Sequence, residues 1–329
     1  MTGTTVPAVA PLPFLPMQPE DAVRVLESVF GIEVSEPPAR LATERDDTFR
    51  VSSRSGDFVL KVAHPDDDRS SIDLQTAALR HASEKDPELP LQRVVPTAAG
   101  NWSPAITGKD GQQRVARLLT FLPGSMLRTN KPTPGQLRQC GIVEARLALA
   151  LADFDHPADG RYMMFDLRHF NDLRAIHPPQ SGQLIARVFD WFDEVLSPVA
   201  HELPVQVLHM DFGLDNVLVD PGTPEYVCGV LDWGDAVRTW RAADLASGLA
   251  SQAGVAGPAW QKPAHIIAGY ISVNPLTPLE HRMLPGLVAM RIAQRILLAE
   301  KLSASLTNNT DYLRRNLELS YQQLRNLDF

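Results

Sequence analysis

The sequence predicts an α+β protein with two lobes: a small N-terminal lobe built on an antiparallel sheet and a larger, mainly helical C-terminal lobe. Short stretches rich in β-forming residues concentrate in the first third of the chain, whereas apolar residues at helical spacing dominate the rest. The pair Pro123-Gly124 separates the two regions and is a strong breaker of regular structure. Strands followed by helices are typical of α+β folds.

The first 17 residues are expected to form a flexible leader. They contain four prolines and no basic segment, so they make a poor signal peptide. Residues 18–30 then carry apolar side chains at helical spacing, and Gly31 stands where a helix would end. The ordered part of the N-terminal lobe is therefore predicted to begin at residue 18.

The strands of the N-terminal lobe are predicted from β-forming residues between turn sequences. Residues 48–51 and 58–62 are separated by SSRSGD and are expected to form a hairpin. Two further strands are expected near residues 92–96 and 113–120. The last one leads directly into Pro-Gly, which places a hinge near residues 118–124.

A helix is predicted from about Ser71 to His81, between the second and third of these strands. Ser70 or Ser71 is the expected N-cap. Asp73 would lie in the first turn, where a negative charge suits the helix dipole.

The remainder of the chain is predicted to be mostly helical. The N-terminal lobe would span residues 18–121 and the C-terminal lobe residues 122–329. The expected C-terminal helices cover residues 134–154, 181–203, 258–274 and 278–303, and the expected strands cover residues 205–208, 216–219 and 226–231.

The overall composition favours a cytoplasmic protein with a small-molecule partner. Hydrophobic residues make up 44% and charged residues 21% of the chain, which is ordinary for a soluble globular protein. No apolar run approaches the roughly 20 residues that span a bilayer. The net charge of −8 argues against nucleic acid or an anionic membrane as the main partner. Cys140 and Cys228 are too few for a disulfide framework, so we expect buried free thiols.

The most informative stretch runs from Val205 to Asp235. A short apolar strand leads into His209-x-Asp211-x4-Asn216, and two further apolar strands deliver Asp232-Trp233-Gly234. This order is typical of a kinase catalytic loop followed by its metal-binding turn. It predicts phosphoryl transfer from a nucleoside triphosphate to a hydroxyl.

The chemistry of phosphoryl transfer explains these residue types. Asp211 can face the acceptor hydroxyl and take its proton, because the protein mainly positions the reactants and neutralises charge. Asp232 and Asn216 supply the oxygen ligands that Mg²⁺ prefers beside phosphates. Apolar strands flank the turn that carries Asp211 and the turn that carries Asp232, and their pairing would bring these two turns together.

Each motif also has an interpretation without catalysis. A His-x-Asp triplet is common, and Asp211 could merely cap a turn; Asp232-Trp233-Gly234 is no more specific alone. Lys61, in the strand FVLKVA, could contact nucleotide phosphates or could be an edge-strand lysine that discourages aggregation. The ordered combination of these motifs favours the phosphotransferase interpretation.

These residues resemble the aminoglycoside phosphotransferase and choline kinase superfamily, which shares the protein-kinase fold. The resemblance covers roughly residues 20–305 and is strongest to the hydroxylysine-kinase-like branch. It depends on ARLLTFLPG, DFDHPA, Met164-Phe165-Asp166-Leu167, HMDFGLDNVLV, and the later DWGD and ADLA segments.

The resemblance implies a set of roles. Asp211 would be the catalytic base, and Mg²⁺ would be held by Asn216 and Asp232. ATP or GTP would donate the phosphoryl group in a nucleotide-binding N-terminal lobe. The resemblance implies that Lys61 and the backbone of Leu119, Thr120 and Phe121 contact the nucleotide. It also implies two supporting residues: His209 would brace the loop, and Asp244 would cap a helix.

The sequence departs from the protein-kinase pattern in two places. Residues 42–49 contain no glycine, so a Gly-rich phosphate loop is missing. Two acids of the following helix region are candidates to pair with Lys61: Asp73 is the nearest fit, and Glu84 is the other candidate. No activation segment or APE motif follows Asp232, which disfavours a protein kinase.

The acceptor is expected to be a small, amine-bearing hydroxyl compound. Asp166, Asp235 and Asp172 could receive a substrate ammonium group, and each could equally be a cap or a surface charge. The branch resemblance implies a hydroxylated amino acid or amino alcohol similar to hydroxylysine. An aminoglycoside antibiotic is the alternative acceptor, and a pseudokinase-type nucleotide-binding module is the alternative of another class.

Overall fold

The computed structural model describes residues 15–43, 45–129, 131–177, 182–220, 222–223, 226–255, 257–303 and 310–329. The predicted leader therefore lies mostly outside the described residues. At its end, Met17 is buried and its backbone N–H donates to the Asp47 carboxylate at 2.9 Å, so the packed chain begins here and not at residue 18.

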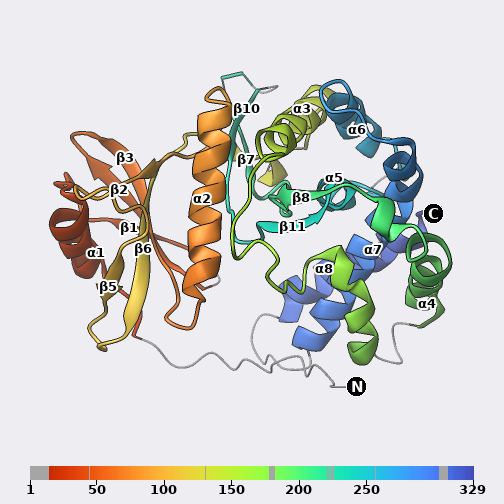
Figure 1. Cartoon of the computed structure of the whole chain (residues 1–329), viewed down its shortest axis with the longest axis horizontal. Helices are drawn as coiled ribbons and strands as arrows, with labels where there is room; N and C mark the ends of the chain where they lie inside the picture. The colour runs from red at the N-terminus through yellow and green to blue at the C-terminus, as the bar shows by residue number, and fades with distance from the viewer. Residues whose placement is uncertain are drawn as a thin grey trace. The chain divides into compact units, whose positions relative to one another are not determined.

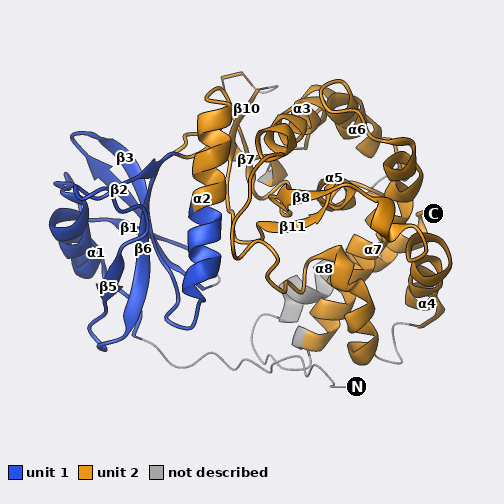
Figure 2. Ribbon diagram, viewed as in Figure 1, with its two compact units in different colours: residues 1–76, 93–121 blue, residues 77–92, 122–329 orange. Residues whose placement is uncertain are grey.

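The chain divides into two compact units, which Figure 2 shows in blue and orange. Unit 1 comprises residues 1–76 and 93–121, and unit 2 comprises residues 77–92 and 122–329. Helix α2 (Arg69–Lys85) therefore contributes its first half to unit 1 and its second half to unit 2.

Unit 1 contains an antiparallel sheet in the order β1-β2-β3-β6-β4, with β5 also paired to β6 (Figure 1). The strands are β1 (Ala39–Leu41), β2 (Asp47–Ser53), β3 (Gly56–Val62), β4 (Val94–Val95), β5 (Ala105–Thr107) and β6 (Gln113–Thr120). The predicted hairpin is β2–β3, and the strand predicted at residues 113–120 is β6; β1 and β5 were not predicted.

One face of this sheet forms the core of unit 1. Phe58, Leu60 and Val62 alternate along β3 and pack with Leu26 from the N-terminal helix. That helix is α1 (Pro19–Val25), continued by a π-helical turn (Leu26–Phe30) that ends at Gly31, whose φ of 68° suits glycine. Lys61 lies between Leu60 and Val62 on β3, so its side chain points to the other face of the sheet.

The start of α2 corrects the predicted cap. The Asp68 carboxylate accepts from the backbone N–H of Ser71 at 3.0 Å, so Asp68 caps the helix rather than Ser70 or Ser71. Because α2 begins at Arg69, Asp73 lies beyond its first turn.

Unit 2 contains short strands and most of the helices (Figure 1). The strands are β7 (Ser125–Met126), β8 (Val205–Leu208), β9 (Val217–Val219), β10 (Val227–Val230) and β11 (Val237–Trp240). The α-helices are α3 (Pro134–Ala150), α4 (Gly182–Trp191), α5 (Arg241–Ala250), α6 (Pro263–Ile271), α7 (Pro278–Ser303) and α8 (Thr310–Arg325). A 3-10 segment covers Leu167–Ile176. The helix predicted at residues 278–303 is α7, and α8 was not predicted.

Two glycines allow α3 and α6 to pack at backbone contact. A Cβ atom on Gly141 would lie 2.0 Å from the Ile266 carbonyl oxygen, and one on Gly269 would lie 2.0 Å from the Arg138 carbonyl oxygen. Larger residues would therefore separate these helices.

Both cysteines are free; Cys140 is buried and Cys228 is partly buried. Among the described residues, no helix is both long and apolar enough to cross a membrane.

Candidate active site in unit 2

Strand pairing brings the two predicted functional loops of unit 2 together. Residues 209–216 connect β8 to β9, and residues 231–236 connect β10 to β11. Strand β9 pairs antiparallel with β10, and β11 pairs antiparallel with β8. Both loops therefore leave and enter paired strands, and the backbone N–H of Leu231 donates to the Asn216 carbonyl oxygen at 2.8 Å.

Asn216 is bonded directly to Asp211. Its side-chain Nδ2 donates to Asp211 Oδ2 at 2.6 Å and to the Asp211 carbonyl oxygen at 3.0 Å. The amide nitrogen therefore holds the carboxylate in place, and the amide oxygen, Oδ1, remains as a ligand atom.

His209 ties the two loops together. This fully buried ring accepts the backbone N–H of Asp211 on Nδ1 at 3.3 Å, and its Nε2 lies 3.1 Å from the Leu231 carbonyl oxygen. Burial lowers the pKa of His209, against the neighbouring Asp211 and Asp232 charges, so the ring is neutral with its proton on Nε2. This geometry is that of a brace, as the sequence resemblance implied.

Asp244 stabilises a strained residue of the catalytic loop. Met210 has a φ of 65°, unusual for a residue with a side chain. Its N–H donates to Asp244 Oδ1 at 2.7 Å, and its carbonyl oxygen accepts from the Ser247 hydroxyl at 3.0 Å. Asp244 therefore steadies this loop but does not cap α5, whose N-cap position is Trp240. Burial raises the pKa of Asp244 to about 7, and the Asp211 charge adds to this shift.

The second loop is also held in an unusual conformation. Asp232 has a φ of 60°, and its Oδ1 accepts the backbone N–H of Gly234 at 3.1 Å. The buried Trp233 ring packs edge-on against His209, with 5.1 Å between centroids. Strained residues held by several contacts are characteristic of functional sites.

The donor set fits a magnesium ion. One carboxylate, on Asp232, and one amide oxygen, on Asn216, are the small set of protein ligands that Mg²⁺ uses when phosphate oxygens complete its coordination. The described residues hold no group of three or more His, Cys, Asp or Glu that could bind a metal alone. A site that shares its ion with nucleotide phosphates needs no such group.

Asp235 lies among the charges of this site without a hydrogen bond of its own within the described part of the chain. Burial raises the pKa of Asp235 to about 7. The Asp211 and Asp232 carboxylates add to this shift, and the Arg291 and Arg161 guanidinium groups oppose it. The carboxylate of Asp235 is therefore close to both predicted catalytic loops.

Asp166 is a correction to the predicted substrate contacts. Its side chain is completely buried and caps the 3-10 segment by accepting the Arg168 N–H at 3.0 Å. The Asp166 carboxylate also accepts hydrogen bonds from the Arg168 guanidinium at 2.8 Å and from the Thr239 hydroxyl at 2.5 Å. With no exposed surface, Asp166 holds the fold together and does not receive a substrate ammonium group. Asp172 is an exposed surface residue.

In unit 1, the structure pairs Lys61 with an acid that was not predicted. The Lys61 ammonium lies 3.7 Å from Asp46, which also lies 3.5 Å from Arg117. Asp73 instead accepts hydrogen bonds from Arg69 at 3.1 Å and from the Ser103 hydroxyl at 2.6 Å. Asp73, the nearest of the two candidates for the partner of Lys61, is therefore engaged by its own helix and by the loop before β5 instead.

Glu84, the other candidate, accepts from Arg80 one turn earlier on α2 and is largely exposed. Asp46 belongs to the glycine-free segment 42–49, of which Glu44 lies outside the described residues.

The predicted hinge residues close the end of β6. The Thr120 N–H donates to the Arg93 carbonyl oxygen and the Phe121 N–H to the Asp57 carbonyl oxygen, each at 2.9 Å. Leu119 pairs with Val59 and Val94. Both N–H groups are used within unit 1, so a nucleotide contact by Thr120 or Phe121 would have to use their carbonyl oxygens.

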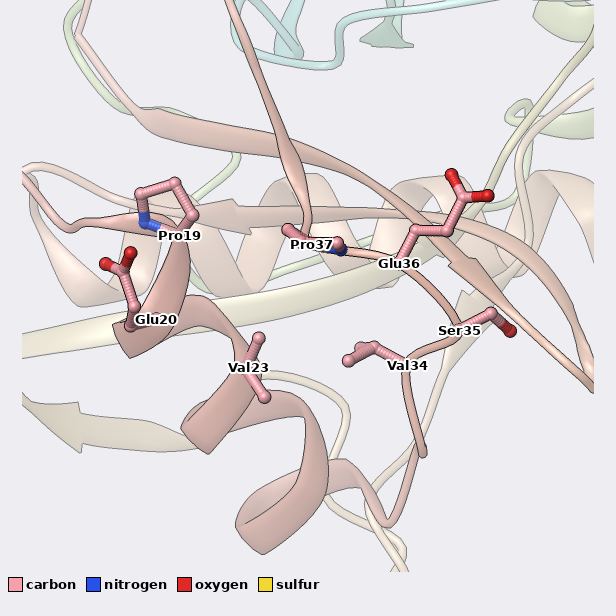
Figure 3. Close-up of a pocket in the computed structure, with 7 residues that line it drawn as sticks. All are labelled: Pro19, Glu20, Val23, Val34, Ser35, Glu36 and Pro37. Carbon is pink, nitrogen blue, oxygen red and sulfur yellow. The ribbon is translucent and has the colours of Figure 1, made fainter.

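A pocket in unit 1 is unrelated to these residues. Figure 3 shows it between α1 and the segment that follows Gly31, lined by Pro19, Glu20, Val23, Val34, Ser35, Glu36 and Pro37. It contains none of the predicted site residues and carries no functional argument.

The sequence reasoning missed the buried Arg291, the partly buried Arg295 and one buried acid, Glu144. The signal was available for the arginines, since they interrupt the otherwise apolar stretch LVAMRIAQRILLA of α7. Glu144 on α3 carried no comparable signal.

Residues 39–270 match the phosphotransferase enzyme family, so the chain belongs to this family, as the motifs predicted. It is an enzyme that transfers a phosphoryl group to a hydroxyl acceptor. Among its relatives is hydroxylysine kinase of Mus musculus, 25% identical over an alignment 334 positions long, gaps included, that covers 93% of this chain and 88% of the relative. The predicted similarity to the hydroxylysine-kinase-like branch is thereby confirmed.

Two solved structures show the fold. A microcompartment-associated aminopropanol kinase is similar with a TM-score of 0.72 and 18% identity, covering 92% of this chain and 94% of that chain. Amicoumacin kinase, in complex with AMP-PNP, Ca²⁺ and Ami, has a TM-score of 0.71 and 15% identity, covering 93% of each chain. The predicted protein-kinase-like α+β fold is confirmed.

Proposed function

We propose that this kinase transfers the γ-phosphoryl group of ATP or GTP to a hydroxyl of an amino alcohol or a hydroxylated amino acid, with Asp211 as the catalytic base. The observation that carries the proposal is the convergence of Asp211, Asn216 and Asp232 on two loops joined through His209. The relatives support the acceptor class, since hydroxylysine and aminopropanol both contain a hydroxyl and an amine.

In this mechanism the acceptor hydroxyl faces Asp211, whose carboxylate orients it and takes its proton. The acceptor oxygen bonds to the γ-phosphorus as the bond from that phosphorus to the β–γ bridging oxygen breaks, leaving the nucleoside diphosphate. The hydrogen bond from Asn216 fixes the carboxylate before the reaction, and preorganised positioning of this kind supplies much of the rate.

Asn216 and Asp232 would hold Mg²⁺, which neutralises charge on the nucleotide phosphates when bound. In unit 1, Lys61 would contact the nucleotide phosphates, held by Asp46. The carbonyl oxygens of residues 119–121 would meet the nucleotide base.

Asp235 is the proposed contact for the acceptor ammonium group. Its partly buried carboxylate accepts no hydrogen bond within the described residues, and a substrate cation would compensate for the desolvation of its charge. An ammonium partner would also lower the pKa of Asp235 from about 7.

Replacing Asp211 with asparagine tests the mechanism. Loss of a general base should lower kcat by about 10²–10⁴-fold while the nucleotide still binds. Phosphorylation of hydroxylysine, amino alcohols and an aminoglycoside would be measured with ATP and with GTP, and nucleotide affinity by titration calorimetry.

Asp220→Asn is the matched control, because Asp220 sits at the far end of β9 and only holds the hairpin turn through Gly222 and Thr223. Near-normal turnover by the Asp211 variant would disprove the mechanism. Phosphorylation of the aminoglycoside alone would disprove the acceptor class.

A further inference from the structure

Helix α7 carries two arginines, the buried Arg291 and the partly buried Arg295, four residues apart and therefore on the same helix face. Arg291 is 6% exposed, and the Nε of Arg295 is buried with no hydrogen-bond partner. Within the described residues, neither guanidinium has a carboxylate within 4.0 Å. Two neighbouring positive charges, one buried and one partly buried, thus lack a carboxylate partner, and this costs free energy unless a ligand supplies an anion.

Neutral groups hold both guanidinium groups in place. Arg291 Nη1 donates to Gln294 Oε1 at 2.8 Å and to the Phe165 carbonyl oxygen at 3.3 Å. The completely buried Gln294 is itself fixed, because its Nε2 donates to the Met164 carbonyl oxygen at 2.8 Å. These contacts orient Arg291 without neutralising its charge.

Arg295 is held in the same manner. Its Nη2 donates to the Ala250 carbonyl oxygen at 3.0 Å and to Gln323 Oε1 at 3.1 Å. Gln323 is buried and fixed by its own hydrogen bonds to the carbonyl oxygens of Ala250 and Ala253. The protein thus positions a second cation beside the first and leaves it without a counter-ion.

The pair lies near the reacting groups of unit 2. Helix α5, which packs against α7, holds the catalytic loop through Asp244 at its start and Arg295 through Ala250 at its end. Burial lowers the pKa of Arg295 to about 10, Arg291 adds to this shift, and the Asp211 carboxylate opposes it. Asp211 thus acts electrostatically on Arg295, Arg291 opposes the raised pKa of Asp235, and both arginines lie on the helix that packs against α5.

We propose that Arg291 and Arg295 bind the carboxylate of the acceptor, so that the substrate is a hydroxylated amino acid rather than an amino alcohol or an aminosugar. Guanidinium groups suit a carboxylate because their N–H groups form paired, charge-assisted hydrogen bonds with its two oxygens. Asp235 takes the ammonium group of the same molecule. This inference rests on the proposed function and selects one of its two acceptor classes.

The test compares acceptors that differ only by a carboxylate. Hydroxylysine is paired with 1,5-diaminopentan-2-ol, and homoserine with 3-aminopropan-1-ol, in steady-state assays with the full-length enzyme. The wild type should prefer the better amino acid over its decarboxylated partner by at least about 100-fold in kcat/KM, because the analogue leaves buried polar groups unpaired. Calorimetric binding of the same compounds to Asp211→Asn should show the same order of affinity.

Arg291→Met and Arg295→Met should each lower kcat/KM for the amino acid by about 100-fold, and the preference for the carboxylate should fall with it. Arg282→Met, an exposed arginine on the same helix, is the control and should retain the preference. If a methionine variant does not fold, the lysine variant keeps the charge without the paired donors, and its preference should fall as well.

The outcomes separate the two proposals. The carboxylate assignment is wrong, and the proposed function stands, if the wild type has the same kcat/KM for amino alcohols and amino acids. The same conclusion follows if the arginine variants lower kcat/KM for both classes of acceptor equally. Equal losses would assign the arginines to phosphate oxygens instead. If neither class is phosphorylated, the proposed function fails and the assignment fails with it.

Discussion

In unit 1 a buried carboxylate is surrounded by cations, whereas two acids in the described part of unit 2, the partly buried Asp235 and the buried Glu144, have no hydrogen-bond partner. Asp47 is 2% exposed and accepts from Arg40 at 2.6 Å, from Arg114 at 2.7 Å and from the backbone of Met17. Burial acts to raise the pKa of Asp47, but these hydrogen bonds outweigh it and lower the pKa.

In unit 2, Asp235 has a pKa raised by burial, and both carboxylate oxygens of the fully buried Glu144 lack a hydrogen-bond partner among the described residues. The first arrangement stabilises a fold. The second costs stability and raises the pKa of both acids. The difference indicates that unit 1 uses buried ionic groups as structure and that unit 2 keeps some of them for function.

Breaking the Asp47 cluster should give the largest change in stability. Asp47→Ala removes the buried carboxylate that pairs with Arg114 and Arg40, which should lower the free energy of unfolding by about 3–5 kcal/mol. Chemical denaturation measures this. Asp57→Ala removes an exposed pair with Arg50 and should cost less than about 1 kcal/mol. Equal losses in the two variants would show that the buried cluster is not structural.

Glu144→Met should have the opposite sign. The carboxylate is completely buried, and its pKa is raised well above the usual range by burial and by Asp244, so an apolar side chain should raise the free energy of unfolding by about 1–3 kcal/mol. Gln136→Met on the same helix is the control and should destabilise, because Gln136 accepts the Thr133 N–H in the capping box. A lower Tm for Glu144→Met would mean that the carboxylate has a stabilising role.

Asp235→Asn should change how stability depends on pH. The folded-state pKa is about 7 and the ordinary value is 3.8, so the folded wild type binds the extra proton between these values. Its free energy of unfolding therefore falls as pH rises from about 4 to about 7 and is level above. The asparagine variant does not lose stability in this way, because asparagine does not titrate. The Tm of the variant minus the Tm of the wild type should therefore be larger at pH 8 than at pH 4.

Tm values for Asp235→Asn should be measured without nucleotide or metal. Asp220→Asn is the contrast, because hydrogen bonds from Gly222 and Thr223 lower the pKa of the exposed Asp220. A Tm difference between Asp235→Asn and the wild type that does not depend on pH would refute the raised pKa.

Asp73→Ala should have the smallest effect. Its pair with Arg69 is more than one-third exposed and should contribute less than about 1 kcal/mol. Because Asp73 does not contact Lys61, KM for the nucleotide should stay the same, whereas Asp46→Asn should raise it. A higher nucleotide KM in Asp73→Ala would restore its predicted role.

Local patterns predicted much of the fold and the order of the catalytic residues. Turn sequences and β-forming residues identified the β2–β3 hairpin, strand β6 and strand β8, and helical spacing identified α7, because these signals act over a few residues. The ordered motifs identified Asp211, Asn216 and Asp232 as one group, and the structure joins the first two by a hydrogen bond.

Partners of side chains were predicted less well. Asp73 and Glu84 were the two candidates to pair with Lys61, but the ion pair that the structure shows is with Asp46. Asp166 was considered a substrate contact because it stands near a family motif, yet Arg168 and Thr239 bury it.

The sequence by itself determined the class of reaction, because the residue types and their order suffice to specify phosphoryl-transfer chemistry. Only the tertiary structure decided which charges are neutralised, since Asp47 and Arg114 are 67 residues apart and meet only on folding. The same holds for Arg295: its position on α7 follows from helical spacing, but its neutral partners come from α5 and α8, which meet it only on folding.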